Sequence, residues 1–334
     1  MSATVQGGRQ AEPGAGGGAG AGAPLVELGR TGIRVSPVGI GTWAWGDRMV
    51  WGYGREYGDD ALAEAFQAAV AAGINWFDTA EIYGNGRSER LLGEFLARMP
   101  DGHSRVLVAS KFMPFPWRLR RRSLLGALRA SLRRLGVERI DLYQIHWPYP
   151  PVPVETWMEA LAEARAEGLI RSAGVSNYSA GQMRRAYEVL ARHGIPLASN
   201  QVHYSLLHRE PERNGVLDAC RELGVSLIAY SPLEMGLLTG KYRQGERPKG
   251  VRGAMLARSG ALGRLPSVLG LLQEIGQAHG GKSPAQVALA WLVAKGSLPI
   301  PGAKSAAHAR QHAQAMTICL GPDEVDALDR ASRP

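Results

Sequence analysis

One unit recurs along the chain from residue 24 onward: a short apolar strand, then a loop, then an amphipathic helix. Several of the strand segments are nearly continuous apolar runs, which is typical of parallel strands covered on both faces. Eight such strands alternating with helices predict a (β/α)8 TIM barrel. The predicted strands are 37–41, 74–78, 105–111, 140–146, 172–176, 198–202, 225–230 and 298–301.

Capping residues predict where the helices begin and end. Ser123, Ser179 and Ser283 are expected as N-caps, and Pro284 takes the first helical position of its helix. Glycines are expected to end six helices, at positions 73, 136, 168, 194, 224 and 296. A short β-hairpin within 25–36 is expected to precede the barrel and cap its bottom.

Composition and length indicate a single globular domain over 24–334. The chain has 334 residues, 45% of them hydrophobic, which is enough for a large core. Residues 1–23 are rich in Gly and Ala, lack the apolar segment of a secretory signal, and are read as a flexible tail. No run of eighteen apolar residues occurs, so no membrane span is expected.

The charge and the cysteines exclude several functional classes. The net charge is +9, but no basic motif interleaved with aromatic residues accompanies it, so nucleic acid is not an expected partner. The two cysteines, Cys220 and Cys319, belong to no CxxC or Cys/His cluster, and no metal site is expected. Two core thiols fit a reducing, cytoplasmic location.

Polar residues follow three adjacent predicted strands and a nearby loop. Asp78, Lys111 and His146 end the second, third and fourth strands, and Tyr83 lies in the loop after Asp78. Taken singly, the Asp could cap a helix, the Lys and His could be solvated rim residues, and the Tyr could be packing. Barrel enzymes place their active sites at these strand ends. The four together therefore indicate an acid/base site.

The chemistry of this group favours carbonyl reduction. A phenol has a pKa of about 10 in water, and a nearby ammonium lowers it, so Lys111 is expected to make Tyr83 a better acid. Asp78 would hold Lys111 charged and oriented. His146 would donate a hydrogen bond to an oxygen on which negative charge develops. None of the four can supply a hydride, so a cofactor is implied.

Over about residues 25 to 330 the sequence resembles the aldo-keto reductase superfamily. The matching stretches are "FDTAEIYG", "ASKF", "LYQIHWP", "GVSNYS", "SNQVHYSLL", "AYSPLEMGLLTGKY" and "PIPGAKS", in that order. The stretches "IGTWAWGD" and "KYRQGERPKGVRG" are similar to the bacterial and plastid-type branch. The resemblance implies a catalytic tetrad of Asp78, Tyr83, Lys111 and His146. It implies hydride from C4 of a nicotinamide and a proton from Tyr83.

The resemblance also implies how the cofactor, NADPH/NADP+, is held without a GxGxxG motif. Ser176, Asn177 and Gln201 would bind the carboxamide, Tyr230 would stack on the nicotinamide ring, and Lys304 would pair with the 2′-phosphate. The further expected contacts are Thr42, Trp43, Asp78, Ser231, Pro232, Leu233, Gly236, Leu237, Lys241, Pro301, Gly302, Ala303, His308, Gln311 and His312. The last segment departs from the family, which commonly has Gln, Glu and Asn at positions 308, 311 and 312.

Aromatic residues in the loops after strands one, three and four predict an apolar substrate wall. Trp43, Tyr83, His146 and Trp147 are the expected substrate contacts. Trp45, Trp51, Met113 and Trp117 lie in the same loops, although any single Trp could belong to the core. The basic run 118–122 is read as a solvated approach to the next helix, with attraction of an anionic substrate as the alternative.

Three functional classes are compared. NADPH-dependent reduction of an aldehyde or ketone is favoured. A cofactor-binding regulatory subunit, as in the channel-associated members of the superfamily, is the alternative. A phosphate-binding barrel lyase or isomerase is disfavoured, because the motifs contain no glycine-rich phosphate loop. The exposed helix faces show no apolar stripe beyond core needs, so a monomer and a homo-oligomer stay equally open.

Overall fold

The computed structural model describes residues 24–242, 253 and 263–333. The predicted flexible tail, residues 1–23, lies outside the described residues, as does most of the stretch "KYRQGERPKGVRG". Within the described ranges, no helix combines the length and the apolarity needed to span a bilayer.

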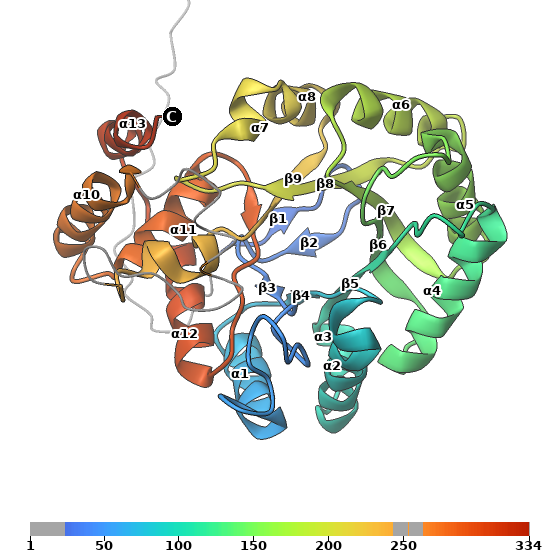
Figure 1. Ribbon diagram of the computed structural model, residues 1–334, viewed down its shortest axis with the longest axis horizontal. Coiled ribbons are helices and arrows are strands. Elements are labelled where there is room, and N and C mark those ends of the chain that lie inside the picture. Colours follow the sequence, from blue (N-terminus) through green and yellow to red (C-terminus); the bar gives the residue numbers. More distant parts are fainter. Residues whose placement is uncertain (1–23, 243–252, 254–262, 334) are drawn as a thin grey trace, which may run out of the picture.

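Eight parallel strands form one curled sheet, and each predicted strand is confirmed (Figure 1). Backbone hydrogen bonds close the barrel between its first and last strands: Gly39 N donates to Pro299 O at 3.0 Å, and Gly41 N donates to Pro301 O at 3.1 Å. The strands are β3 (Ile40–Gly41), β4 (Trp76–Asp78), β5 (Leu107–Phe112), β6 (Ile140–Ile145), β7 (Ile170–Ser176), β8 (Leu197–His203), β9 (Ser226–Tyr230) and β10 (Leu298–Pro299).

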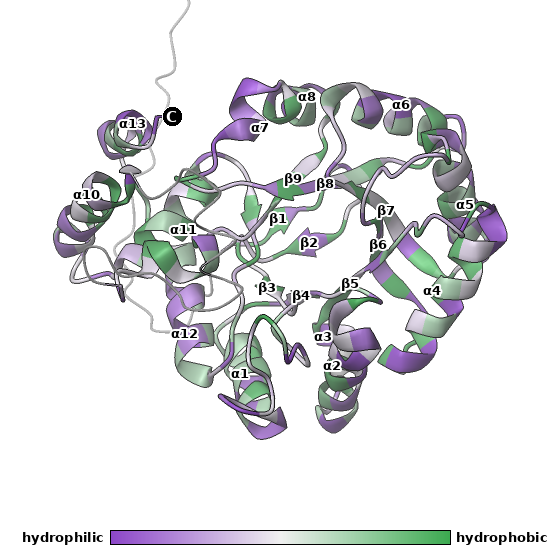
Figure 2. Cartoon of the chain, viewed as in Figure 1, coloured by the Kyte–Doolittle hydropathy of each residue, from purple (hydrophilic) through white to green (hydrophobic). Residues whose placement is uncertain are grey.

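Helices surround the sheet and turn their polar faces outward (Figure 2). Two of them, α10 and α13, pack together and against α11 on one side of the barrel. The helices are α1 (Asp59–Ala71), α2 (Arg87–Arg98), α3 (Gly102–Arg105), α4 (Arg121–Leu135), α5 (Val154–Ala166), α6 (Ala180–Ala191), α7 (Glu210–Arg213), α8 (Val216–Leu223), α10 (Leu265–Ala278), α11 (Pro284–Ala294), α12 (Ala306–Gln314) and α13 (Pro322–Ala331).

Two of the three predicted serine caps are confirmed. Ser179 and Ser283 both form capping boxes, with Gln182 and Gln286 at the third helical position. The prediction for Ser123 is wrong, because α4 begins two residues earlier and the Ser123 amide already donates to Arg120 O at 2.9 Å. No side chain caps that helix, and its first residue is an arginine.

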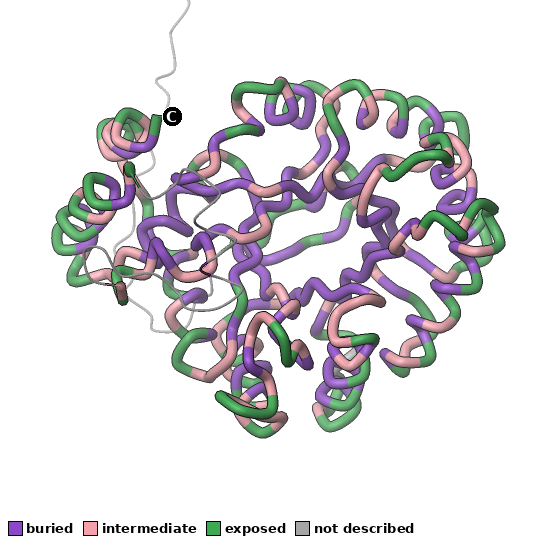
Figure 3. Tube along the Cα trace, in the orientation of Figure 1, coloured by how far each residue is buried: buried purple, intermediate pink, exposed green. Residues whose placement is uncertain are grey.

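The predicted hairpin is present and closes the bottom of the barrel. Strands β1 (Val26–Glu27) and β2 (Arg34–Val35) pair antiparallel. Leu28, Ile33 and Val35 pack into a separate cluster of buried side chains from the strands. The larger core lies between the sheet and the helices, and Figure 3 shows buried segments along the strands and along the inner helix faces. The bottom of the barrel is therefore closed, and the opposite end is left for a site.

Candidate active site

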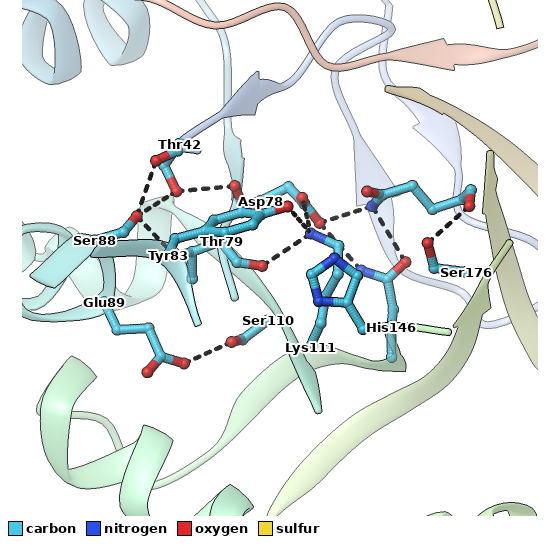
Figure 4. Close-up of polar contacts among 12 residues, drawn as sticks. Thr42, Asp78, Thr79, Tyr83, Ser88, Glu89, Ser110, Lys111, His146 and Ser176 are labelled. Atoms are coloured by element: carbon cyan, nitrogen blue, oxygen red, sulfur yellow. Dashed lines mark hydrogen bonds and ion pairs between the residues drawn. The ribbon is translucent and has the colours of Figure 1, made fainter. Parts of the chain in front are cut away.

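The strand register brings the four predicted catalytic residues to one end of the barrel (Figure 4). Asp78 pairs with Ala109 across β4 and β5, and Lys111, two residues further along, points to the same face. His146 directly follows β6, and Tyr83 begins the short 3₁₀ helix η1 (Tyr83–Gly86) beyond β4. Residues that lie apart in the sequence therefore converge at the carboxyl ends of three neighbouring strands.

The Lys111 ammonium is the centre of this group. It forms an ion pair with Asp78 and also donates to Thr79 O at 3.0 Å and to the Tyr83 hydroxyl at 3.4 Å. The Lys111 side chain is 0% exposed and that of Asp78 2% exposed, so solvent screens this pair very little. The Tyr83 hydroxyl therefore lies beside a fixed, buried cation.

Two glutamines complete the coordination of the carboxylate. Asp78 Oδ2 accepts from Gln144 Nε2 at 3.1 Å and from Gln201 Nε2 at 2.9 Å. A buried ion pair is stabilising only when its remaining hydrogen-bonding atoms are satisfied, and these amides satisfy them. Gln144 was missed by the sequence reasoning, although its place two residues before His146 puts it on the inner face of the same strand.

A network of hydroxyl groups fixes the backbone beside the carboxylate. Thr42 Oγ1 donates to Asp78 O at 3.0 Å, and Ser88 Oγ lies 2.7 Å from Thr42 Oγ1 and 2.9 Å from Thr79 Oγ1. Thr42 was predicted to contact the cofactor. Its hydroxyl is buried in this network, so its side chain positions Asp78. Ser88 had no sequence signal, because it lies inside a helix.

The pKa values differ in part from the expectation. Burial lowers the pKa of Lys111, but Asp78 and Tyr83 outweigh it, and the net shift is upward. Burial raises the pKa of Tyr83 above its ordinary value, Lys111 opposes the rise, and Asp78 adds to it. The expectation of a lowered phenol pKa is therefore wrong for the net value. The lysine acts in the predicted direction, but its charge is matched by the neighbouring carboxylate.

His146 is held in its neutral form. Burial, and after it the Lys111 ammonium, keep the pKa of His146 well below its usual range. The imidazole lies edge-on to the Tyr83 ring, with ring centroids 5.8 Å apart. Its buried Nδ1 has no hydrogen-bond partner among the described residues. A neutral imidazole beside a phenol can donate one hydrogen bond to a reacting oxygen without adding a charge.

The residues predicted for the carboxamide form a connected cluster on β7, β8 and β9. Ser176 Oγ donates to Gln201 O at 2.8 Å, and Asn177 Nδ2 donates to His146 O at 3.1 Å. Asn177 Oδ1 accepts from the Tyr230 hydroxyl at 3.1 Å. Because the amide nitrogen of Gln201 donates to Asp78, its amide oxygen is the atom that can accept a hydrogen bond from a ligand. An acceptor at this position fits the amino group of a carboxamide.

Comparison with known proteins places the chain in a family. A profile of the Aldo/keto reductase family matches residues 37–333. The chain belongs to that family. It is 41% identical over 311 residues to the chloroplastic pyridoxal reductase of Arabidopsis thaliana, covering 90% of this chain and 84% of that protein. It is 32% identical over 285 residues to a putative voltage-gated potassium channel subunit beta of Schizosaccharomyces pombe, covering 80% of each.

Solved structures agree with the fold. An aldo/keto reductase from Klebsiella pneumoniae, in complex with NADP and acetate, has a TM-score of 0.72 and 29% identity, covering 92% of this chain and 95% of that one. The predicted superfamily and the (β/α)8 fold are thereby confirmed.

A column of rings lies next to the nicotinamide position expected for the family. Tyr230 stacks on His203 at 5.3 Å between centroids, and His203 stacks on His208 at 3.9 Å. Glu234, 3% exposed, accepts from His203 Nε2 at 2.7 Å and from Ser205 Oγ at 2.6 Å. Sequence reasoning missed this column, although His203 and Glu234 both lie within the matching motifs.

The segment predicted to cover the pyrophosphate has an unusual backbone. Ser231, Glu234 and Met235 have φ values of 50°, 47° and 51°, in the left-handed region that non-glycine residues seldom adopt. Leu237 is fully buried, so its side chain belongs to the core and its backbone is the part that a ligand could meet. The remaining predicted contacts of this segment are Pro232, Leu233, Gly236 and Lys241, and all are among the described residues.

The predicted adenosine and phosphate residues lie on the last strand and on α12. His312 is 3% exposed, its Nε2 lies 3.2 Å from Gly302 O, and its Nδ1 has no partner among the described residues. Because a carbonyl can only accept, Nε2 carries the proton and Nδ1 is a buried acceptor. Gln311 Nε2 donates to Ser283 Oγ at 2.8 Å. Burial lowers the pKa of His312 to about 4, so the imidazole is uncharged near neutral pH and offers no positive charge to a phosphate.

The mouth of the site is aromatic, but not all of the predicted wall contributes. Trp43 lies 6.5 Å from Tyr83 between ring centroids, and Trp147 stacks on Tyr149 at 5.5 Å. Trp45 is wrong as a wall residue: it is 0% exposed, and its indole donates to Ala303 O at 2.9 Å. Its ring packs in the core against Phe77 and Phe95.

In the basic run 118–122, residues 119–122 are exposed, in agreement with the predicted solvated approach, and Arg118 departs from it. Arg118 forms an ion pair with the largely buried Glu81 and donates to Met113 O at 2.9 Å. Its guanidinium lies over the Phe112 ring at 5.0 Å. The carboxylate of Glu81 also accepts from Met113 N at 2.7 Å. Arg118 therefore ties the loop after β4 to the loop after β5, while Arg121 and Arg122 open α4.

Proposed function

We propose that this aldo-keto reductase reduces aldehydes or ketones to alcohols with NADPH. The observation that carries the proposal is the buried Asp78–Lys111 ion pair, which holds an ammonium 3.4 Å from the Tyr83 hydroxyl. A fully desolvated pair of this kind is costly to build, and it acts on a phenol at the carboxyl end of the barrel strands. Acid catalysis at Tyr83 accounts for that arrangement.

The chain's own residues would act on the carbonyl oxygen from two sides. Tyr83 transfers its hydroxyl proton to that oxygen, and Lys111 stabilises the phenolate that remains. Neutral His146 donates a hydrogen bond to the same oxygen. Asp78 keeps Lys111 charged, because its carboxylate raises the pKa of the ammonium. When bound, NADPH supplies the hydride to the carbonyl carbon from C4 of its nicotinamide.

Residues of three segments fit the cofactor. Ser176, Asn177 and Gln201 would hold the carboxamide, with the Gln201 oxygen as acceptor. Tyr230 would stack on the nicotinamide, supported from below by His203 and His208. Lys304 would pair with the 2′-phosphate, and His308, Gln311 and His312 would lie at the adenine end. Charge-assisted contacts to a phosphate favour NADPH over NADH.

The aromatic mouth favours flat substrates. Phe115 and Trp117 stack at 4.7 Å, and Trp147 and Tyr149 stack at 5.5 Å, with both pairs nearly parallel. Ring faces of this kind accept planar aromatic bodies. The Arabidopsis relative is named a pyridoxal reductase, so pyridoxal, a planar aromatic aldehyde, belongs among the first substrates to be tried.

The test compares the native protein with Tyr83→Phe. NADPH oxidation is followed with a panel of aldehydes and ketones that includes pyridoxal, and NADPH binding is measured separately. We expect kcat of Tyr83→Phe to fall by roughly 10²–10⁴-fold with binding retained, the usual contribution of a general acid. Tyr187→Phe, in α6 and away from the site, is the matched control. Equal turnover in both variants would show that Tyr83 is not the acid.

The alternative is a cofactor-binding regulatory subunit with little turnover. The relation to a putative potassium channel subunit beta supports it, and the tetrad does not argue against it. NADPH binding to the native protein with no turnover of any carbonyl in the panel would favour this alternative over the reductase.

A further inference from the structure

Lys304 already has an anionic partner on the chain itself. Its ammonium lies 3.5 Å from the Glu56 carboxylate and over the Tyr57 ring, 4.7 Å from the centroid. Glu56 belongs to the loop between β3 and α1, residues 47–57, which is called the strap below. Lys304, which would bind the 2′-phosphate, is therefore paired with a carboxylate from a segment far away in the sequence.

The strap is an ordered platform for this carboxylate. The Asp47 side chain accepts from Val50 N at 2.7 Å, and Tyr53 N donates to Asp47 O at 3.0 Å. The Tyr57 hydroxyl donates to Ala44 O at 2.6 Å. Gly52 has a φ of +75°, and a Cβ there would lie 2.9 Å from the Glu56 carboxyl group. The backbone thus leaves room for the Glu56 side chain to fold back toward Lys304.

Among the described residues, positive groups also lie near Lys304. Ser305 caps the N-terminus of α12, where backbone amides favour an anion. Burial lowers the pKa of His308, and the nearby Lys304 and Lys241 ammonium groups lower it further. Lys304 and Lys241 thus both act on His308, and α12 begins directly after Lys304. A dianion suits this charge better than a single carboxylate at 3.5 Å.

We propose that Glu56 occupies Lys304 in place of the 2′-phosphate and is displaced when NADPH binds. The inference rests on the proposed function for the role of Lys304. The pair is easily exchanged, because Glu56 is 56% exposed and exposed ion pairs are weak. A carboxylate beside an incoming phosphate also repels it. NADH has no 2′-phosphate, so it leaves the pair intact. Glu56 therefore reduces the preference for NADPH over NADH.

The test is a substitution that should improve binding. The dissociation constants of NADPH and NADH are measured for the native protein and for Glu56→Gln. We expect NADPH to bind about 3- to 10-fold more tightly to Glu56→Gln, and NADH to change by less than about 2-fold. Asp60→Asn is the matched control, because it removes one charge from an exposed acid near the strap that is not paired with Lys304. Damage to the fold would weaken binding, which is the opposite sign.

A double variant shows whether the effect passes through Lys304. In Glu56→Gln with Lys304→Met, NADPH should gain no affinity relative to Lys304→Met alone. Weaker NADPH binding to Glu56→Gln, or an equal change for both cofactors, would overturn the inference. Native protein that binds and turns over NADPH, with no effect of Glu56→Gln, would overturn the role of Glu56 and leave the proposed function standing. Absence of NADPH binding to the native protein would overturn both.

Discussion

Two ion pairs of the same kind lie at opposite ends of the proposed cofactor site. At the catalytic end, Lys111 and Asp78 are 0% and 2% exposed, and two glutamine amides bind the free carboxylate oxygen. At the phosphate end, Lys304 and Glu56 are 21% and 56% exposed and 3.5 Å apart. The first pair is surrounded by protein, whereas the second is partly exposed, its carboxylate more than its ammonium.

The difference shows how burial decides what a pair can do. In the interior, separating two charges leaves an uncompensated ion, so the catalytic pair is fixed before any ligand arrives. In solvent, each charge is rehydrated when the pair opens, so the phosphate pair can exchange partners. The fixed pair at the reacting atoms and the exchangeable pair at the remote phosphate are thus both made of an ammonium and a carboxylate.

The largest expected effect breaks the buried pair. Lys111→Met removes the cation beside Tyr83 and leaves the buried Asp78 carboxylate without its counter-ion. We expect kcat to fall by roughly 10²–10⁴-fold and the free energy of unfolding to fall by about 3–5 kcal/mol. Steady-state kinetics and denaturant unfolding measure the two effects.

A double variant separates chemistry from stability. Asp78→Asn combined with Lys111→Met removes both charges, so most of the lost stability should return while activity stays low. Recovery of activity along with stability would show that the pair is structural and has no part in proton transfer.

An effect of intermediate size concerns acid stability at the phosphate end. The pKa of His312 is lowered to about 4 in the folded protein, whereas an unfolded histidine titrates near 6.5. As the pH falls, the unfolded state takes up the proton first. Stability present above about pH 6.5 is therefore lost between there and about pH 4, on the order of 3 kcal/mol in all.

The variant His312→Asn checks this assignment by urea unfolding across that pH range. Its free energy of unfolding should depend less on pH between about 6.5 and 4 than that of the native protein. His193→Asn, at an exposed position after α6, serves as control. Equal pH dependence in native protein and His312→Asn would contradict the prediction.

The smallest expected effect on the free energy of unfolding comes from a Glu→Gln substitution at an exposed pair. The same substitution is made in a buried pair for comparison. Glu234→Gln removes a carboxylate that is 4% exposed and bonded to His203 and Ser205, and should lower the free energy of unfolding by about 1–3 kcal/mol. Glu56→Gln should change it by less than about 1 kcal/mol. Denaturant unfolding of both variants measures the two losses. Equal losses of unfolding free energy would show that burial does not distinguish the two pairs.

Much of the fold was predictable because its signals are local. Apolar runs bounded by turns marked all eight strands, and Ser179 and Ser283 lie where the capping pattern places them. Ser123 failed because three arginines precede it and the chain turns helical among them without a capping side chain. A capping residue predicts a boundary only when no earlier residue can begin the helix.

The sequence by itself determined the barrel, the order of its strands and the placement of Asp78, Lys111 and His146 at strand ends, because strand periodicity fixes which residues share a face and an end. Tertiary structure alone decided the rest. Gln144 and Gln201 reach Asp78 from 66 and 123 residues away. The net rise in the pKa of Tyr83 and the pairing of Lys304 with Glu56 depend on burial and on distant neighbours. Desolvation is a property of the packed molecule, and no local pattern encodes it.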